Sequence, residues 1–171
     1  NSVSKINRDS YFLTQRNFNN SEYLKGQISE IYRYEKYLKE SDVIYHLAFN
    51  NNIKDIENNF KKCLDEQIYF FDFLKSLTRN KEKVTRLIFT SSVTIYGNHN
   101  DQISEASDDK LFTKYDQLKL DCENYIKENL QSDKFQCINL RLSNIYGKAD
   151  SSEKSRNLIY KIIKNAFLEK K

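Results

Sequence analysis

Proline is absent from this chain of 171 residues, and glycine occurs only three times. Average usage of about 5% would give roughly nine prolines. Some tight turns must therefore be built from asparagine, aspartate and serine, which tolerate left-handed backbone best after glycine. No proline-rich linker or internal repeat divides the chain. Methionine is also absent, so we expect the natural protein to begin upstream of Asn1.

The cysteines and histidines are too few for a disulfide framework or a zinc site. Cys63, Cys122 and Cys137 are an odd number with no close pairing, which predicts free thiols in a reducing cytoplasm. His46 and His99 cannot complete a metal site with thiols so scattered. We interpret His46, at the end of a predicted strand, as structural, with a side role near a cofactor as an alternative. No apolar run approaches the length of a membrane span, so we expect no membrane insertion.

The composition that remains is that of a folded domain. Apolar residues make up 39% of the chain and charged residues 30%, a balance typical of globular proteins. The formal net charge is +4, and lysines gather near the carboxyl end. Positive charge suits an anionic substrate and, in principle, nucleic acid. A solvated helix face explains the basic run better than a single-strand binding surface does, so we expect no nucleic-acid partner.

Hydrophobic periodicity predicts alternating strands and helices. Strands are expected at 11–14, 23–28, 43–47, 84–89 and 137–142. Helices are expected at 1–8, as the end of a longer helix, and at 31–38, 54–77, 113–130 and 158–171. We expect the last helix to bury Leu158, Ile162, Ile163, Ala166 and Phe167. Such alternation specifies an α/β fold with a parallel sheet covered on both faces.

One constellation of side chains carries chemistry. Tyr115 and Lys119 are spaced to lie one above the other on a helix, and Thr113 with Asp116 predicts a capping box at its start. A free tyrosine titrates near pH 10, so a phenolate at neutral pH needs roughly 4 kcal/mol of stabilisation. A neighbouring ammonium in a partly desolvated cleft supplies much of it. Ser92, at the end of a predicted buried strand, would donate or relay a hydrogen bond to the reacting oxygen. This is hydride-transfer chemistry.

Four segments extend the pattern over almost the whole chain. They are Asp-Val-Ile-Tyr-His-Leu-Ala at 42–48, Phe-Thr-Ser-Ser-Val-Thr-Ile-Tyr-Gly at 89–97, Tyr115 with Lys119, and Leu-Arg-Leu-Ser-Asn-Ile-Tyr-Gly at 140–147. With these segments the chain resembles the extended short-chain dehydrogenase/reductase family, in its branch of nucleotide-sugar epimerases and dehydratases. The resemblance implies a Rossmann-like doubly wound parallel sheet, an NAD- or NADP-dependent enzyme, and a nucleotide-diphosphate sugar as substrate.

The resemblance also implies roles for individual residues. Ser92, Tyr115 and Lys119 match the catalytic Ser/Thr, Tyr and Lys, and Lys119 would also hold the nicotinamide ribose. The other positions that match cofactor-binding residues are Gln27 and Ile28 beside the adenine, and Leu47, Ala48 and Phe49 in the loop along the cofactor. The positions that match substrate-binding residues are Ser92, Asn144, Asn157 and Leu158. A homodimer through two helices per subunit is common in relatives, and the helices holding Phe71 and Tyr125 are the candidates here.

Parts of the family pattern are missing. The glycine loop that cradles the pyrophosphate of the cofactor does not occur in the sequence, so we expect the chain to lack the first strand and this loop. We interpret residues 1–150 as an amino-terminally truncated NAD(P)-binding domain and 151–171 as the start of a substrate-binding domain that is mostly absent. Arg16, and no acid, follows the strand at 11–14. This leans weakly toward NADP, although an ordinary surface arginine is an equal explanation.

Three functions follow as alternatives. The leading one is an epimerase that inverts a sugar carbon by transient hydride transfer to a bound nicotinamide. In dehydratases of this family two acids follow the catalytic Ser/Thr, where this chain has Val93 and Thr94, which argues against a dehydratase. The second is an NADPH-dependent ketoreductase acting on a sugar or small carbonyl, motivated by Arg16. The third is a non-catalytic binding or scaffold protein derived from the family, motivated by the absent glycine loop.

Overall fold

The central strands form one parallel sheet. A computed structural model describes residues 2–7, 10–14, 26–78, 84–98, 102–145 and 158–168. In it β3 (Val43–His46), β4 (Thr85–Ser92) and β5 (Phe135–Leu142) pair in that order. Leu87 lies opposite Ile44 on one side and opposite Cys137 on the other. Helices lie between these strands in the chain, as parallel pairing requires. The prediction of an α/β, Rossmann-like fold is confirmed.

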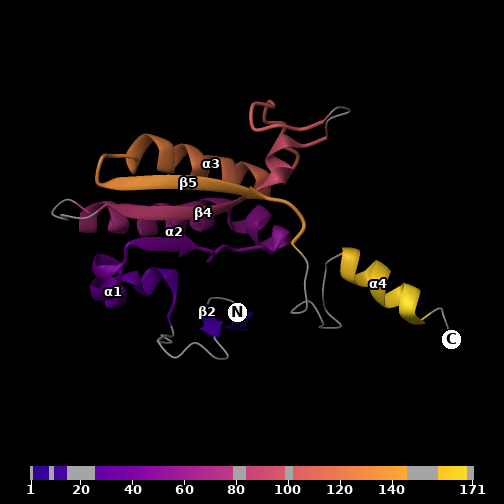
Figure 1. The fold of residues 1–171 in the computed structure, drawn as a ribbon, viewed down its shortest axis with the longest axis horizontal. Helices are drawn as coiled ribbons and strands as arrows, with labels where there is room; N and C mark the ends of the chain where they lie inside the picture. The colour runs from indigo at the N-terminus through magenta and orange to yellow at the C-terminus, as the bar shows by residue number, and fades with distance from the viewer. Residues whose placement is uncertain are drawn as a thin grey trace.

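Helices connect the strands and pack together on one side of the sheet (Figure 1). The 3-10 helix η1 (Ile28–Tyr34) runs into α1 (Glu35–Glu40). The long helix α2 (Ile53–Thr78) joins β3 to β4, and α3 (Lys114–Asn129) joins β4 to β5. α2 and α3 lie side by side. The helices expected at 54–77 and 113–130 are confirmed, each end within one residue.

The hydrophobic core lies between the sheet and α2 and α3. Alternation along β4 points Leu87 and Phe89 toward these helices. Phe71 of α2 and Ile126 of α3 join the same buried cluster. Burying each such side chain contributes about 1.5–3 kcal/mol. The two helices are therefore held by the same residues that hold the central strand.

The opposite face of the sheet is apolar and exposed. The side chains that alternate with the core residues are Val43 and Tyr45 on β3 and Ile138 and Leu140 on β5. Tyr45 is 65% exposed and Ile138 is 42% exposed. Across the described ranges, the helices cover one face of the sheet, where the sequence predicted cover on both.

The amino-terminal segment departs from the prediction. Residues expected to end a helix form β1 (Ser2–Asn7), which pairs antiparallel with β2 (Ser10–Thr14) in a separate two-stranded sheet. The helix expected at 1–8 is therefore wrong, while the strand at 11–14 is confirmed. β1 contains two serines and the β-branched residues Val3 and Ile6, and both residue types disfavour helix in so short a segment.

The segment before α1 also differs from the prediction. A strand was expected at 23–28, but Gly26 and Gln27 are outside any strand and Ile28 begins η1; the first residues of that range lie outside the described part of the chain. Ile28, Ile31 and Leu38 pack against the core from this helical stretch. Their spacing suits a helix packed on α2 better than a strand.

Helix α4 (Leu158–Leu168) forms where a final helix was predicted. Its expected burial is wrong: Ile162 is 58% exposed and Phe167 76% exposed, and Ile163 and Ala166 are exposed as well. Figure 1 shows α4 apart from the three-stranded sheet. An apolar stripe predicts which face of a helix is able to pack against another element, but it does not predict which element that is.

Candidate active site

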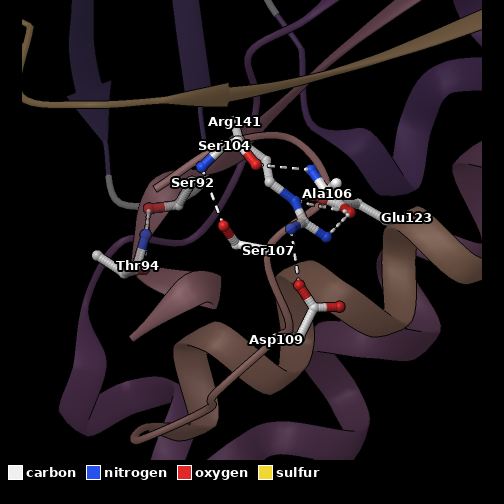
Figure 2. Close-up of polar contacts among 8 residues, drawn as sticks. All are labelled: Ser92, Thr94, Ser104, Ala106, Ser107, Asp109, Glu123 and Arg141. Carbon is white, nitrogen blue, oxygen red and sulfur yellow. Dashed lines mark hydrogen bonds and ion pairs between the residues drawn. The ribbon is translucent and has the colours of Figure 1, made fainter. Parts of the chain in front are cut away.

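The carboxyl ends of the parallel strands define one edge of the sheet, where open α/β sheets bind their ligands. β4 ends at Ser92, which starts the 3-10 helix η2 (Val93–Tyr96). The Ser92 hydroxyl accepts a hydrogen bond from the Thr94 amide at 3.2 Å and lies 2.8 Å from the Thr94 hydroxyl. Figure 2 shows this short turn beside the end of the strand. The serine hydroxyl is therefore fixed by its own helix cap.

Gly97 closes the turn that follows Ser92. Its φ of 64° lies in the left-handed region, where side chains are disfavoured. A Cβ atom there would also lie 2.2 Å from the backbone oxygen of Lys110. The Lys110 amide donates to the Ile95 carbonyl at 2.8 Å, so the turn and the loop before α3 are joined at this point.

A capping box starts α3 and sets the position of Tyr115. The Thr113 amide donates to the Asp116 carboxylate at 2.9 Å, and the Asp116 amide donates to the Thr113 hydroxyl at 3.1 Å. The predicted N-cap and its reciprocal partner are confirmed. Because the helix begins at Lys114, Tyr115 and Lys119 lie on its first turns, facing the end of β4.

Tyr115 lies within hydrogen-bonding reach of Ser92. Burial, the largest effect, raises the pKa of the Tyr115 phenol above its usual value. The hydrogen bond with Ser92 lowers this pKa, and the charge of Asp116 raises it further. The pKa of Tyr115 is thus raised overall.

Lys119 is buried beneath an aromatic ring. The side chain is 3% exposed. Its ammonium donates to the Thr90 carbonyl at 2.5 Å and lies 3.5 Å from the centroid of the Phe49 ring. The Tyr115 ring centroid is 5.8 Å away. Burial lowers the pKa of Lys119 to about 8, against the charges of Cys122 and Glu123, which raise it.

The sequence led us to expect that Lys119 lowers the pKa of Tyr115, whereas this pKa is raised, mainly by burial. The Phe49 ring lies over the Lys119 ammonium and stands edge-on to Tyr115, with the two ring centroids 6.0 Å apart. A cation–π contact contributes about 0.5–2 kcal/mol, and a hydrogen bond to a charged donor about 1.5–3 kcal/mol. The ring and the Thr90 carbonyl therefore both hold the ammonium in its buried position.

A cavity of about 370 Å³ lies next to this ring. Three of the predicted cofactor-binding residues, Gln27, Ile28 and Phe49, line it. The other lining residues are Ser29, Asn50, Lys62, Cys63, Glu66, Gln67 and Leu118. The size falls in the range of small-molecule sites. The cavity thus lies between the η1 segment and the loop after β3.

The remaining predicted residues are not gathered in this cavity. Leu47 and Ala48 lie in the same loop as Phe49 but do not line the cavity, and Leu47 is exposed. Asn144 is exposed just beyond the end of β5. Arg16 and Asn157 lie outside the described residues, and Leu158 is the first residue of α4.

The groups present fit part of a dinucleotide. An ammonium and two hydroxyls suit the hydroxyls of a ribose and the oxygen of a substrate, and the cavity of about 370 Å³ continues from Phe49 toward η1. The sequence holds three glycines, Gly26, Gly97 and Gly147, and no glycine loop. The described residues therefore fit the nicotinamide-proximal and adenine-proximal parts and supply no glycine cradle for the pyrophosphate.

His46 serves the core. Its ring nitrogen Nε2 lies 2.7 Å from the Gln67 side-chain oxygen, and the ring stacks on Phe70 with centroids 4.2 Å apart. Burial lowers the pKa of His46 to about 4. The histidine is therefore neutral and structural, as the sequence interpretation favoured. The pairing of His46 with Gln67 was not predicted, because the two residues are 21 positions apart in the chain.

An arginine clamp that the sequence did not predict lies close to the Ser92 turn. Arg141 on β5 donates to the Glu123 carboxylate on α3 at 2.8–3.2 Å and to Asp109 at 2.7 Å. Its guanidinium also lies 4.4 Å from the centroid of the Tyr96 ring. Figure 2 shows Arg141 between the two carboxylates. One side chain thus ties β5, α3, η2 and the loop at 102–113 together.

Neither a metal site nor a membrane span is present in the described ranges. No group of three histidine, cysteine, aspartate or glutamate residues there is arranged to hold a metal ion. None of the described helices combines the length and the apolar character needed to cross a bilayer.

Comparison with protein families gives a match over nearly the whole chain. The model described as the NAD dependent epimerase/dehydratase family matches residues 2–171. A search of curated proteins finds no match.

Solved structures share the fold at low identity. Pal from Bacillus thuringiensis is 20% identical with a TM-score of 0.66, over 84% of this chain and 46% of that chain. UDP-N-acetylglucosamine 4-epimerase from Methanobrevibacter ruminantium M1, in complex with UDP-N-acetylmuramic acid, is 24% identical with a TM-score of 0.62, over 80% and 44%. UDP-glucose 4-epimerase from Brucella ovis, in complex with NAD, is 18% identical with a TM-score of 0.57, over 69% and 37%. The chain spans less than half the length of these proteins.

Proposed function

The chain belongs to the NAD-dependent epimerase/dehydratase family, and from that premise we propose that it is a nucleotide-sugar epimerase working by transient hydride transfer. The observation that carries the proposal is the meeting of Ser92, Tyr115 and Lys119 at the carboxyl edge of the parallel sheet. Structural neighbours described as 4-epimerases of UDP-sugars support the substrate class. We place the enzyme in the cytoplasm because its thiols are free.

The proposed mechanism assigns one task to each side chain. Tyr115 takes the proton from a sugar hydroxyl and later returns it, and Ser92 donates a hydrogen bond to the same oxygen. A nicotinamide, when bound beside these residues, would supply the reversible hydride acceptor that inversion of that carbon requires. Lys119 binds the ribose and, once turned to the phenol, favours its ionised form.

The other predicted residues complete the proposal. The predicted cofactor-binding positions lie beside the bound cofactor in this proposal: Gln27 and Ile28 near the adenine, and Leu47, Ala48 and Phe49 in the loop along it. Asn144, with Asn157 and Leu158, contacts the nucleotide diphosphate of the substrate. Residues 1–150 then form the NAD(P)-binding domain, and 151–171 begin the substrate domain. A homodimer through α2 and α3, the helices of Phe71 and Tyr125, stays a prediction; Phe71 itself is fully buried, so outward residues of α2 would make such an interface.

An epimerase suits this site better than a dehydratase. The two positions after Ser92 are Val93 and Thr94, and the Thr94 hydroxyl is engaged with Ser92 at 2.8 Å. Neither residue supplies the acid that elimination of water requires. The fold does not separate the two reactions, since one structural neighbour is described as an NDP-hexosamine 5,6-dehydratase.

Replacing the phenol tests the epimerase proposal. In the full chain, Tyr115→Phe should lower turnover of a UDP-sugar by at least about a hundredfold, the lower range for loss of a general acid–base. Tyr125→Phe is the matched control, because that phenol lies on the same helix but donates to Asp72. Epimer formation by chromatography, NAD binding by calorimetry and circular dichroism give the three readouts. Unchanged epimerisation by Tyr115→Phe would refute the proposal.

An NADPH-dependent ketoreductase is the second candidate, favoured by Arg16 and the missing acid after β2. The two functions differ in how they treat the cofactor, since a reductase exchanges it in each turnover while an epimerase keeps it. Purified full chain that retains NAD through gel filtration would exclude the reductase. Stoichiometric oxidation of added NADPH with a carbonyl substrate would favour it.

A further inference from the structure

Phe49 contacts the Lys119 ammonium and also lines the cavity. The residue is 7% exposed. Its ring centroid lies 3.5 Å from the Lys119 nitrogen, and the residue is part of the wall of the cavity of about 370 Å³. Lys119 itself does not line the cavity, so a ligand there would lie beside Phe49, whose ring contacts the ammonium.

The ammonium has capacity for a further hydrogen bond. A lysine carries three N–H donors. Within the described ranges, the oxygen acceptor for this ammonium is the Thr90 carbonyl. The aromatic rings of Phe49 and Phe89 lie 3.5 and 4.9 Å from the nitrogen. An aromatic face is a weaker partner for a charged donor than a hydroxyl oxygen is.

The backbone next to Phe49 is held while space is available to its side chain. The Asn50 side chain donates to Asp55 at 2.7 Å and accepts from the Asn52 amide at 3.0 Å. These bonds anchor the loop just after Phe49 to the start of α2. Phe49 also belongs to the buried core cluster, so the movement open to it is a side-chain rotation toward the cavity that the residue lines, with this loop left in place.

We propose that Phe49 is a displaceable cap on Lys119, which a hydroxyl of the cofactor ribose replaces when the dinucleotide binds. Displacement turns the ammonium from the ring to the ligand and opens it toward Tyr115, so the acid–base group becomes competent when cofactor is present. This inference rests on the proposed function, because it takes a dinucleotide as the ligand. Phe49 is a positioning residue, since it acts through Lys119.

Chemical labelling tests the cap without any cofactor. Acetic anhydride at pH 9, with mass spectrometry of the digested full chain, gives the acetylation rate of each lysine. Phe49→Ala should raise the rate at Lys119 at least fivefold, and Phe49→Leu, which keeps apolar bulk but not the ring, should raise it less. An unchanged rate at Lys119 in both variants would overturn the proposal.

A matched aromatic–lysine pair on the same protein supplies the control. Lys114 lies 5.2 Å from the centroid of the Phe60 ring, but Lys114 is exposed. Phe60→Leu should therefore leave acetylation of Lys114 and Lys119 within twofold of the wild-type rates. An equal rise at Lys119 in Phe60→Leu and Phe49→Leu would point to general loosening of the fold and would overturn a specific cap. Circular dichroism checks that each variant is folded.

Binding of NAD tests the ligand half of the proposal. The affinity for NAD, measured by calorimetry on the full chain, should rise about tenfold in Phe49→Ala, because the ring no longer has to be displaced. NAD should protect Lys119 from acetylation in wild type and variant alike. If Phe49→Ala accelerates labelling but no variant binds NAD, the proposed function fails and the ribose is excluded as the displacing ligand. If NAD binds equally to wild type and Phe49→Ala, the proposed function survives and the cap is overturned.

Discussion

The two faces of the three-stranded sheet differ in what they support. On the covered face, Leu87 and Phe89 are at most 1% exposed beneath α2 and α3. On the open face, Tyr45 and Ile138 are the corresponding apolar positions, and both are exposed. Every group of the candidate acid–base site belongs to the covered side or to its edge. The comparison shows that α3 packs against the core of the covered face and also carries Tyr115 and Lys119 at the edge of the sheet.

The two arginines on the strands of this sheet also differ between its covered and open faces. Arg141 reaches toward α3 and is paired with two carboxylates. Arg86 lies on the open side and donates to Gln136 at 3.2 Å. Rigid elements hold functional side chains more accurately than loops do, and here the rigid elements are those of the covered face.

The largest expected effect comes from emptying the covered face. Phe71→Ala removes a fully buried ring and should lower the free energy of unfolding by about 4 kcal/mol, the cost of a large cavity. Urea unfolding followed by circular dichroism measures it. A loss below about 1 kcal/mol would show that the covered face is not a packed core.

The two arginines give a matched pair for the next effect. Arg141→Gln leaves the Glu123 carboxylate, which is 8% exposed, without its guanidinium. The free energy of unfolding should fall by about 3 kcal/mol, as for other broken buried pairs. Arg86→Gln on the open face should change it by less than about 0.5 kcal/mol. Equal losses in the two variants would remove the distinction between the faces.

Acid should weaken the covered face through His46. The pKa of His46 is lowered to about 4 in the fold, against about 6.5 in an unfolded chain. The unfolded chain therefore takes up the proton first, and stability falls as pH drops from about 6.5 toward 4. Between pH 7.5 and 5 the contribution of His46 amounts to about 2 kcal/mol. Urea midpoints across this range should fall less steeply in His46→Gln, and parallel profiles would contradict the assignment.

The smallest effect is expected on the open face. Ile138→Ser removes an apolar side chain that is already 42% exposed, so the free energy of unfolding should change by less than about 0.5 kcal/mol. Binding of an apolar dye to the native chain should decrease, because exposed apolar patches favour association. A loss of 2 kcal/mol or more would mean that this face is covered in the full chain.

The sequence predicted the elements whose signals are local. The capping box of Thr113 and Asp116 lies within one turn, and the helix at 54–77 has a long apolar period, so both could be found without tertiary information. The helix expected at 1–8 failed because a short segment has little local preference to overrule its pairing with β2. The predicted burial of Phe167 failed because periodicity does not supply a partner.

Within the candidate site, the relative placement of Tyr115 and Lys119 was predictable from the sequence, and the surroundings of the ammonium were not. The spacing of Tyr115 and Lys119 placed both on one helix face, which holds. That spacing contains no information on Phe49, which comes from a different loop and covers the ammonium. The arginine clamp was not predicted for the same reason, since Arg141, Glu123 and Asp109 belong to distant segments. The helical spacing did indicate that Glu123 shares a helix face with Lys119, one turn away.

Gly97 allows two backbone segments next to the candidate site to pack closely. Because glycine has no side chain, the Lys110 carbonyl can lie where a methyl group would collide. The turn that begins at Ser92 and the loop leading to α3 therefore pack backbone against backbone. Even a methyl group at position 97 would collide with the Lys110 backbone, so the turn that follows Ser92 or the loop before α3 would have to move. We therefore expect a substitution of Gly97 to disturb the site through its backbone while every reactive side chain stays in the sequence.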